Sequence, residues 1–250
     1  KGLTYGGSKI RQEAAGFGTV YFLARMMEQQ GETLEGKRLA VSGFGNMSWG
    51  VCRKSAELGG KVVTLSGPDG YIYDPDGIKL DVVKEIKEVR RGRIKEYAAQ
   101  VPGSTYTEGC RGIWTIPCDI ALPCATQNEI DVAEAENIVK GGAMAVAEGA
   151  NMPSTPAAID IFRKAGLLFA PAKAANAGGV ATSGLEMAQN AARMGWKAEK
   201  VDARLHHIML DIHHACVQYG GEAKQTNYVR GANIAGFVKV ADAMLAQGVI

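Results

Sequence analysis

The chain has 250 residues, a length that fits one large domain or two small ones. Hydrophobic residues make up 46% and charged residues 22% of the sequence, and the net charge of +2 gives no reason to expect nucleic acid or an anionic membrane as a partner. No apolar run approaches the length of a membrane span, and no basic stretch followed by an apolar one indicates a signal peptide, so a cytoplasmic location is expected.

The first part of the chain predicts a helix followed by a strand–turn–helix–strand unit. Apolar residues near helical spacing predict the helix over residues 13–30. An apolar strand at 39–41 is followed by the glycine turn Gly43-Phe44-Gly45-Asn46 and by a helix-compatible stretch that reaches Leu58. A second apolar strand, at 62–65, completes the pattern of two parallel strands joined by a helix.

The rest of the chain continues this alternation. Proline and glycine clusters between residues 67 and 77 predict a loop with short strands, and residues 80–100 predict a helix broken near Gly92. After Gly178-Gly179 the chain is mainly helical to its end. Buried strands are predicted at 118–123, 144–147 and 167–170, and short helices at 131–140 and from Pro156 onward, with Asp131 and Thr155 placed to stabilise their N-termini.

Strands that alternate with helices predict the α/β class: a doubly wound, Rossmann-like, mostly parallel sheet with helices on both faces and a helical C-terminal segment. Ligands of such sheets bind at the carboxyl ends of the strands. We expect the polar loops that follow the predicted strands to converge there: Ser42–Asn46, Ser66–Asp69, Pro123–Asn128, Glu148–Asn151 and Lys173–Asn176.

The glycine turn at 43–46 is typical of a pyrophosphate-binding site. The first glycine permits the turn, the second lets the backbone approach the phosphates, and the following helix offers free N–H groups. The third position of the fingerprint is Ser48, which is still small, and Asp69 follows the second strand where ribose hydroxyls are usually bound. The alternative is an ordinary glycine turn in a parallel sheet.

Several longer motifs carry a resemblance to a known family, and they run nearly from end to end: Gly6-Gly7-Ser8 with Arg11 and Glu13, the glycine turn, residues 119–128 (DIALPCATQN), 147–153 (AEGANMP), 173–180 (KAANAGGV), 183–187 (SGLEM) and 231–237 (GANIAGF). With these motifs the chain resembles the hexameric glutamate dehydrogenases of bacteria and lower eukaryotes. The resemblance implies interconversion of L-glutamate with 2-oxoglutarate and ammonia, with a nicotinamide cofactor and a homohexameric assembly.

The resemblance covers only the second of the family's two domains. It implies a dinucleotide-binding domain over residues 1–200, with a hinge at 1–12, and C-terminal helices over 201–250 that return toward the substrate domain. The lysine-glycine-glycine motif of the catalytic lysine is absent, because Tyr5 precedes Gly6-Gly7. The chain begins at Lys1 without an initiator methionine, so we expect a fragment or a processed product that binds nucleotide without turnover and contains no catalytic residue.

The resemblance also implies roles for individual residues. Ser183 matches the serine that receives the substrate carboxylate, and Val180 lies beside it in the substrate site; the alternative for Ser183 is a helix residue bonded to its own turn. Ala15 and Phe17 stand where the family usually has threonine and tyrosine, and alanine cannot make the threonine's bond near the nicotinamide. The expected cofactor-binding residues are Gly43, Phe44, Gly45, Asn46, Met47, Pro68, Asp69, Ala125, Thr126, Asn151 and Asn176.

Three of these residues predict which cofactor is bound. Phe44 offers no hydrogen bond, Pro68 has no N–H for a phosphate, and Asp69 would repel one. They favour NAD over NADP. The basic cluster Arg90, Arg91 and Arg93 argues the other way, unless it is only a solvated helix end.

Other signals do not point to a site. The four histidines, at 206, 207, 213 and 214, are too far apart along one helix to share an ion, and Cys124 is expected to be a packed thiol, so no metal site is expected. Five cysteines without a CxxC pair are typical of reduced thiols in the cytosol. Two alternative functions stay open: a non-catalytic nucleotide-binding module, and a domain of a related branched-chain or aromatic amino-acid dehydrogenase.

Overall fold

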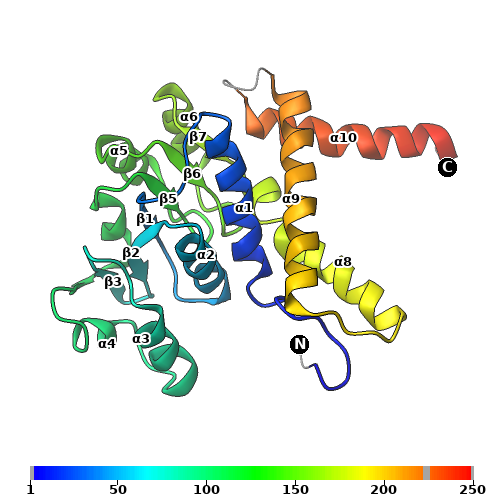
Figure 1. Ribbon diagram of the computed structural model, residues 1–250. Helices are drawn as coiled ribbons and strands as arrows, with labels where there is room; N and C mark the ends of the chain where they lie inside the picture. Colours follow the sequence, from blue (N-terminus) through cyan, green and yellow to red (C-terminus); the bar gives the residue numbers. More distant parts are fainter. Residues whose placement is uncertain (1–2, 222–225, 249–250) are drawn as a thin grey trace.

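The computed structural model describes residues 3–221 and 226–248. At its centre lies a seven-stranded sheet with the strand order β4-β3-β2-β1-β5-β6-β7 (Figure 1). Neighbouring strands among β2, β1, β5, β6 and β7 are parallel, and β3 and β4 are antiparallel additions at one edge. The strands are β1 (Arg38–Val41), β2 (Lys61–Ser66), β3 (Gly70–Tyr73), β4 (Thr105–Glu108), β5 (Ile120–Leu122), β6 (Ala145–Ala147) and β7 (Leu168–Ala170).

The strand order changes direction at β1: β2 to β4 lie on one side of it and β5 to β7 on the other. Leu39 of β1 pairs with Val62 of β2 on one side and with Ile120 of β5 on the other. The chain therefore builds outward to β4 and then returns to the far side of β1. Such a reversal opens a crevice at the carboxyl ends of the two central strands, where ligands of doubly wound sheets bind.

Alternate residues of the central strands enter two different cores. Leu39 and Val41 belong to the larger hydrophobic cluster, whereas Ala40 between them belongs to the smaller one. Ile120 and Ala121 divide in the same way. Because successive side chains of a strand point to opposite faces, both faces are buried under helices, and the doubly wound α/β fold is confirmed.

The helices are grouped by the core that they cover. The larger core is packed by α1 (Ala14–Glu28), α2 (Asn46–Glu57), α3 (Leu80–Lys84), η1 (Glu85–Val89), α4 (Lys95–Ala98), α7 (Ala172–Ala175) and α9 (Ala198–Gly220). The smaller core is packed by η2 (Cys110–Thr115), α5 (Val132–Lys140) and α6 (Pro156–Lys164). Two more helices, α8 (Gly178–Ala191) and α10 (Tyr228–Gln247), complete the fold, and α10 extends away from the sheet (Figure 1).

Local sequence explains where several helices begin. Asp131 and Glu134 form a capping box at the N-terminus of α5. The Thr155 hydroxyl accepts a hydrogen bond from the Ala158 N–H at 3.3 Å, and Pro156 occupies the first turn of α6. These helix starts and the predicted positions of β1, β2, β5, β6 and β7 are confirmed within two residues.

Helix α1 crosses two neighbours at glycines. A Cβ on Gly16 would lie 2.5 Å from the Met47 carbonyl oxygen of α2, and one on Gly18 would lie 2.7 Å from Cα of Gly178 in α8. Side chains at these positions would push the helices apart. Helix α9 also packs on α1, with Leu205 and Met209 in the shared core.

Four elements differ from the prediction. Helix η2 was not predicted, and α7 lies where a loop at 173–176 was expected. Strand β4 was not predicted, because its four residues are mostly exposed at the sheet edge and carry no apolar signal. The predicted helix at 80–100 is three pieces, with a π-helical turn, η1, between α3 and the break before α4. None of the helices among the described residues has both the length and the hydropathy that crossing a bilayer requires.

Candidate functional site

The glycine turn joins the ends of three strands. Gly43 has φ of 85°, a conformation that favours glycine. Its N–H donates to Ser66 Oγ at the end of β2 (2.8 Å), and a Cβ on it would lie 2.9 Å from the Cys124 carbonyl oxygen after β5. Ser42 Oγ accepts from the Cys124 N–H at 2.8 Å. The turn is therefore fixed at the point where the sheet reverses direction.

The turn leads into the uncapped N-terminus of α2. No side chain caps this end, and Ser48 Oγ donates to the Gly45 carbonyl rather than accepting from an N–H. Gly45 is exposed, and a Cβ on it would meet no atom within 4 Å. Open space above a glycine, beside free helix N–H groups, is the arrangement that fits the phosphates of a dinucleotide.

A first cavity, which we call the glycine-turn cavity, has a volume of about 430 Å³. It brings together the loops after β1, β2 and β5 with the short helix η2. Its wall combines apolar surface from Phe44, Pro68 and Trp114 with the charged groups of Arg111 and Glu129. Gly43, Gly45, Ala125 and Thr126 complete the predicted residues that line it.

Glu129 holds the loop after β5 in place. Its Oε1 accepts from the N–H groups of Ala125 (3.0 Å) and Thr126 (3.4 Å). Burial raises the pKa of this carboxyl, while these bonds and the Arg111 charge act in the opposite direction. The carboxylate therefore orients the part of the loop that lies between two cavities.

The second cavity, the asparagine cavity, has a volume of about 760 Å³ and shares Ala125 and Thr126 with the first. Its two amides are linked: Asn176 Nδ2 donates to Asn151 Oδ1 at 2.8 Å and to the Gly149 carbonyl at 3.0 Å. The remaining predicted residues that line it are Ala15, Met47, Val180 and Ser183, joined by Arg11, Gln127 and Lys173.

Glu148 supports the loops that carry both asparagines. It is 4% exposed, and its two oxygens accept from the N–H groups of Ala172 (2.8 Å) and Ser154 (3.3 Å). Burial raises its pKa. Because Ala172 begins α7, this carboxyl ties the loop after β6 to the helix that leads to Asn176.

Two predicted residues do not line either cavity. Asn46 accepts from Lys87 Nζ at 3.2 Å, and Asp69 lies 3.6 Å from Arg93 Nη1. Ser183 lines the asparagine cavity, but its hydroxyl donates to the Gly179 carbonyl one turn earlier (3.2 Å). Arg111, Trp114 and Glu129 were not predicted, since no local pattern marks residues that reach a cavity through the tertiary fold.

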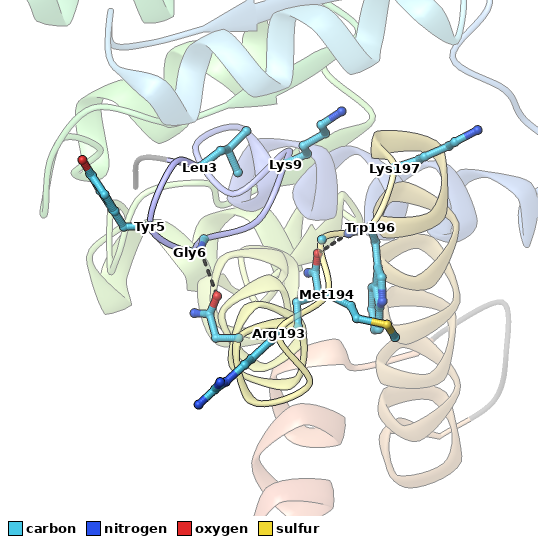
Figure 2. A pocket seen from close by; sticks show the side chains of 12 residues that line it. Leu3, Tyr5, Gly6, Lys9, Arg193, Met194, Trp196 and Lys197 are labelled. Atoms are coloured by element: carbon cyan, nitrogen blue, oxygen red, sulfur yellow. Dashed lines mark hydrogen bonds between the residues drawn. The ribbon is translucent and has the colours of Figure 1, made fainter.

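A third cavity lies apart from these two. It has a volume of about 710 Å³ and is formed by residues 3–9 and the connection between α8 and α9, with Lys9, Arg193 and Lys197 around it (Figure 2). The Gly7 N–H donates to Asn190 Oδ1 across it at 2.9 Å. None of the predicted cofactor or substrate residues lines this cavity.

His213 and Cys124 are both packed in the interior of the protein. His213 is buried, its Nε2 lies 3.2 Å from the Tyr228 hydroxyl, and burial lowers its pKa to about 4. Burial raises the pKa of the Cys124 thiol well above its ordinary value, as for a packed thiol. No group of three metal-binding side chains occurs within residues 3–221 and 226–248.

Comparisons with known proteins agree on one family. A sequence model of the glutamate/leucine/phenylalanine/valine dehydrogenases matches residues 6–248. The NADP-specific glutamate dehydrogenase of Escherichia coli is 61% identical, over 100% of this chain and 56% of the relative. The NAD-specific enzyme of Bacteroides fragilis is 53% identical, over 100% of this chain and 57% of the relative.

The solved structures agree. The crystal structure of Plasmodium falciparum glutamate dehydrogenase has a TM-score of 0.94 and 41% identity, covering 100% of this chain and 54% of that one. The chain therefore spans a little over half the length of the relatives that it matches.

These relatives correct the expectation that NAD is favoured over NADP. Relatives named NADP-specific are 54–62% identical to this chain, and others are named NAD-specific or NAD(P)-specific. The ion pair with Arg93 gives a physical reason, because it offsets the charge of Asp69 that was expected to repel a phosphate. Arg111, which was not predicted, lines the glycine-turn cavity and adds a cation there.

Proposed function

The chain belongs to the glutamate/leucine/phenylalanine/valine dehydrogenase family, and on that premise we propose that it is the cofactor-binding part of a glutamate dehydrogenase. The reaction is the reversible oxidative deamination of L-glutamate to 2-oxoglutarate and ammonia. The observation that carries the proposal is the pair of cavities that meet at Thr126, one beside a glycine turn and one lined by linked asparagines. Their placement fits a molecule with phosphates in its middle and a ring system at each end.

The residues divide between the two ends of the cofactor. The uncapped first turn of α2 would hold the bridging phosphates, and the glycine-turn cavity would hold the adenosine. Asn151 and Asn176 would hold the nicotinamide end, since amides both donate and accept hydrogen bonds. Bound there, the cofactor supplies a hydride acceptor for the carbon that carries the amino group.

Substrate would lie at the outer end of the asparagine cavity. Val180 is exposed there, and Ser183 lies one turn further along α8. For a substrate carboxylate to bind, the Ser183 hydroxyl must turn from the Gly179 carbonyl toward the ligand. The catalytic lysine and aspartate of the family would come from the remainder of the intact subunit, because their motif is absent from these 250 residues.

The proposal extends to the intact protein. Residues 1–12 would act as the hinge, residues 201–250 would return toward the substrate domain, and the subunits would form a homohexamer. The resemblance supports these assignments, and mass measurement of the full-length protein in solution tests the assembly. A monomeric full-length protein would contradict the homohexamer.

The test combines binding with turnover. Calorimetric titration of NADP and NAD into the 250-residue chain is expected to show binding, with NADP favoured as in the relatives named NADP-specific. Glutamate-dependent reduction of the cofactor is expected only from the full-length protein, with leucine as the comparison substrate. Absence of binding, or turnover by the 250-residue chain alone, would refute the proposal.

A further inference from the structure

We propose that Gln189 is a positioning residue of the substrate site, which fixes the direction of helix α8 and thereby the place of Ser183. The inference rests on the proposed function, in which Ser183 receives a substrate carboxylate. It assigns a role to a buried amide that lines the third cavity, rather than the two cavities assigned to cofactor and substrate.

The side chain of Gln189 joins three segments of the chain. It is 2% exposed, and its Nε2 donates to Ser8 Oγ at 2.8 Å and to the Leu185 carbonyl at 3.1 Å. Its Oε1 accepts from the Trp196 N–H at 2.9 Å (Figure 2). Both amide protons and the amide oxygen are therefore used. The amide links the segment before α1, the last turns of α8 and the connection to α9.

A second bond brings the same two segments together. The Gly7 N–H donates to Asn190 Oδ1 at 2.9 Å, and a Cβ on Gly6 would lie 3.1 Å from the same oxygen. The backbone of residues 6–8 therefore passes directly beside the end of α8. Asn190 is exposed whereas Gln189 is buried, so the bonds of Gln189 are the ones that water does not weaken.

The buried face of α8 is polar. Its buried residues are Gly178, Thr182, Glu186 and Gln189. Ala181 adds a partly buried contact with the larger core, whereas Val180 and Met187 are exposed. Apolar burial is not directional, but hydrogen bonds are, so the amide of Gln189 defines where the end of α8 lies.

Ser183 lies between two contacts that hold α8. At the start of the helix, Gly178 lies against Gly18 of α1, where a Cβ on Gly18 would be 2.7 Å from Gly178 Cα. At a rise of about 1.5 Å per residue, Ser183 is about 7.5 Å and Gln189 about 16.5 Å from Gly178 along the axis. A shift of about 2 Å at the far end of α8 would therefore move Ser183 by about 1 Å, which is enough to break a hydrogen bond to a carboxylate.

The experiment measures the steady-state kinetics of the full-length protein. Gln189→Met removes the amide at similar volume, and Ser8→Ala removes only its partner in residues 6–8. Gln100→Met makes the same exchange at an exposed amide that bonds to its own turn, and it serves as the matched control. Ser183→Ala is combined with Gln189→Met in a double-mutant cycle, which measures whether the two residues act together.

We expect Gln189→Met to raise KM for glutamate and 2-oxoglutarate about tenfold with kcat changed less than about twofold, because it weakens binding of a carboxylate that does not react. Ser8→Ala should give a smaller rise in KM. The Kd of the cofactor in calorimetry should stay at the wild-type value, and Gln100→Met should match wild type throughout. In the Ser183→Ala background, Gln189→Met should change KM by less than about twofold, because the hydroxyl through which it acts is gone.

Three kinetic results overturn the proposal while leaving the proposed function intact. The first is a folded Gln189→Met variant with the wild-type KM. The second is a loss of cofactor affinity as large as the rise in KM, which would indicate a general distortion. The third is a pair of effects that multiply in the cycle, because Gln189 would then act independently of Ser183.

Circular dichroism and melting temperature identify a variant that does not fold. If Gln189→Met is unfolded, Ser8→Ala takes its place in the cycle. If both are unfolded, the amide maintains the fold as a whole, and the proposal is overturned. Full-length wild-type protein that does not reduce the cofactor with glutamate would instead refute the proposed function.

Discussion

Asn176 donates a hydrogen bond from Nδ2 to Oδ1 of Asn151 at 2.8 Å, and this bond connects the loops after β6 and β7. The same nitrogen donates to the Gly149 carbonyl, so both of its protons are used. The Asn176 oxygen stays available to accept from a ligand amide, and the Asn151 nitrogen stays available to donate. The pair therefore offers one acceptor and one donor at fixed separation.

Replacing Asn176 by alanine should weaken both cofactor binding and the fold. Removing the side chain leaves the Gly149 carbonyl and Asn151 Oδ1 without this donor, and each lost hydrogen bond typically costs about 1 kcal/mol. We expect cofactor affinity to fall about tenfold in calorimetry. Asn137→Ala, on the far helix α5, is the control and should bind as wild type does; equal affinities in the two variants would contradict the role of Asn176.

Two glycines of the same turn should respond differently to alanine. Gly43→Ala places a methyl group 2.9 Å from a backbone oxygen at positive φ, so it should lower the free energy of unfolding by about 1–3 kcal/mol. Gly45→Ala meets no atom of the protein, so its stability should be near that of wild type while nucleotide affinity falls about tenfold. Thermal unfolding and titration of both variants check the pair. Unchanged affinity in Gly45→Ala would show that the phosphates do not approach this turn.

Ala15→Thr should strengthen cofactor binding. Ala15 lines the asparagine cavity, and the family resemblance implies a threonine hydroxyl at this position in the related enzymes. The added hydroxyl can supply one hydrogen bond, so the dissociation constant should fall several-fold. Ala15→Val adds the same branch without a donor and should bring no gain. Gly179 lies close to the Ala15 side chain, so a larger residue at position 15 could crowd it. A melting temperature equal to that of wild type excludes such crowding.

The stability of the fold should fall in acid through His213. The pKa of His213 is about 4 in the folded chain, below its ordinary value of 6.5, because burial disfavours the charged ring. Folding therefore favours the neutral ring. The contribution of neutral His213 to the free energy of unfolding is fully present above pH 6.5. It is lost as the pH falls toward 4, and the free energy of unfolding then decreases by up to about 3 kcal/mol.

Urea unfolding between pH 7 and 4 measures this effect. His213→Gln should show a weaker pH dependence than wild type, whereas the exposed His207→Gln should keep the wild-type slope. Identical slopes in all three proteins would assign the acid sensitivity to other groups.

The parts of the fold that were predicted depend on local signals. The glycine turn at Gly43, the cap at Thr155 and the apolar strand at 39–41 are each decided within a few residues, so the sequence pattern is sufficient. Strand β4 was not predicted because it is a solvated edge strand that pairs with β3 only in the folded chain. The same reason explains the site: Arg111 and Glu129 reach the glycine-turn cavity across distances in sequence that no local pattern covers.

The cofactor prediction was wrong for a similar reason. The basic cluster that includes Arg93 was weighed against the possibility of a solvated helix end, whereas the folded chain places the Arg93 guanidinium 3.6 Å from the Asp69 carboxylate. The predicted site residues stay predictions as to their roles, although twelve of the fourteen positions line one of two adjoining cavities and only Asn46 and Asp69 do not.

The glycine contacts of α1 fix the distance between helices α2 and α8. At Gly16 this helix touches the N-terminal turns of α2, which follow the glycine turn, and at Gly18 it touches the start of α8, which borders the asparagine cavity. The atoms nearest to both glycines belong to the backbone of the neighbouring helix, which cannot change rotamer to absorb a displacement. Helix α1 thus fixes the distance between the N-terminus of α2 and the start of α8, which border the two ends of the site. A ligand of different span could be accommodated only if both crossings changed together, and one substitution at either glycine would alter the fit at both ends.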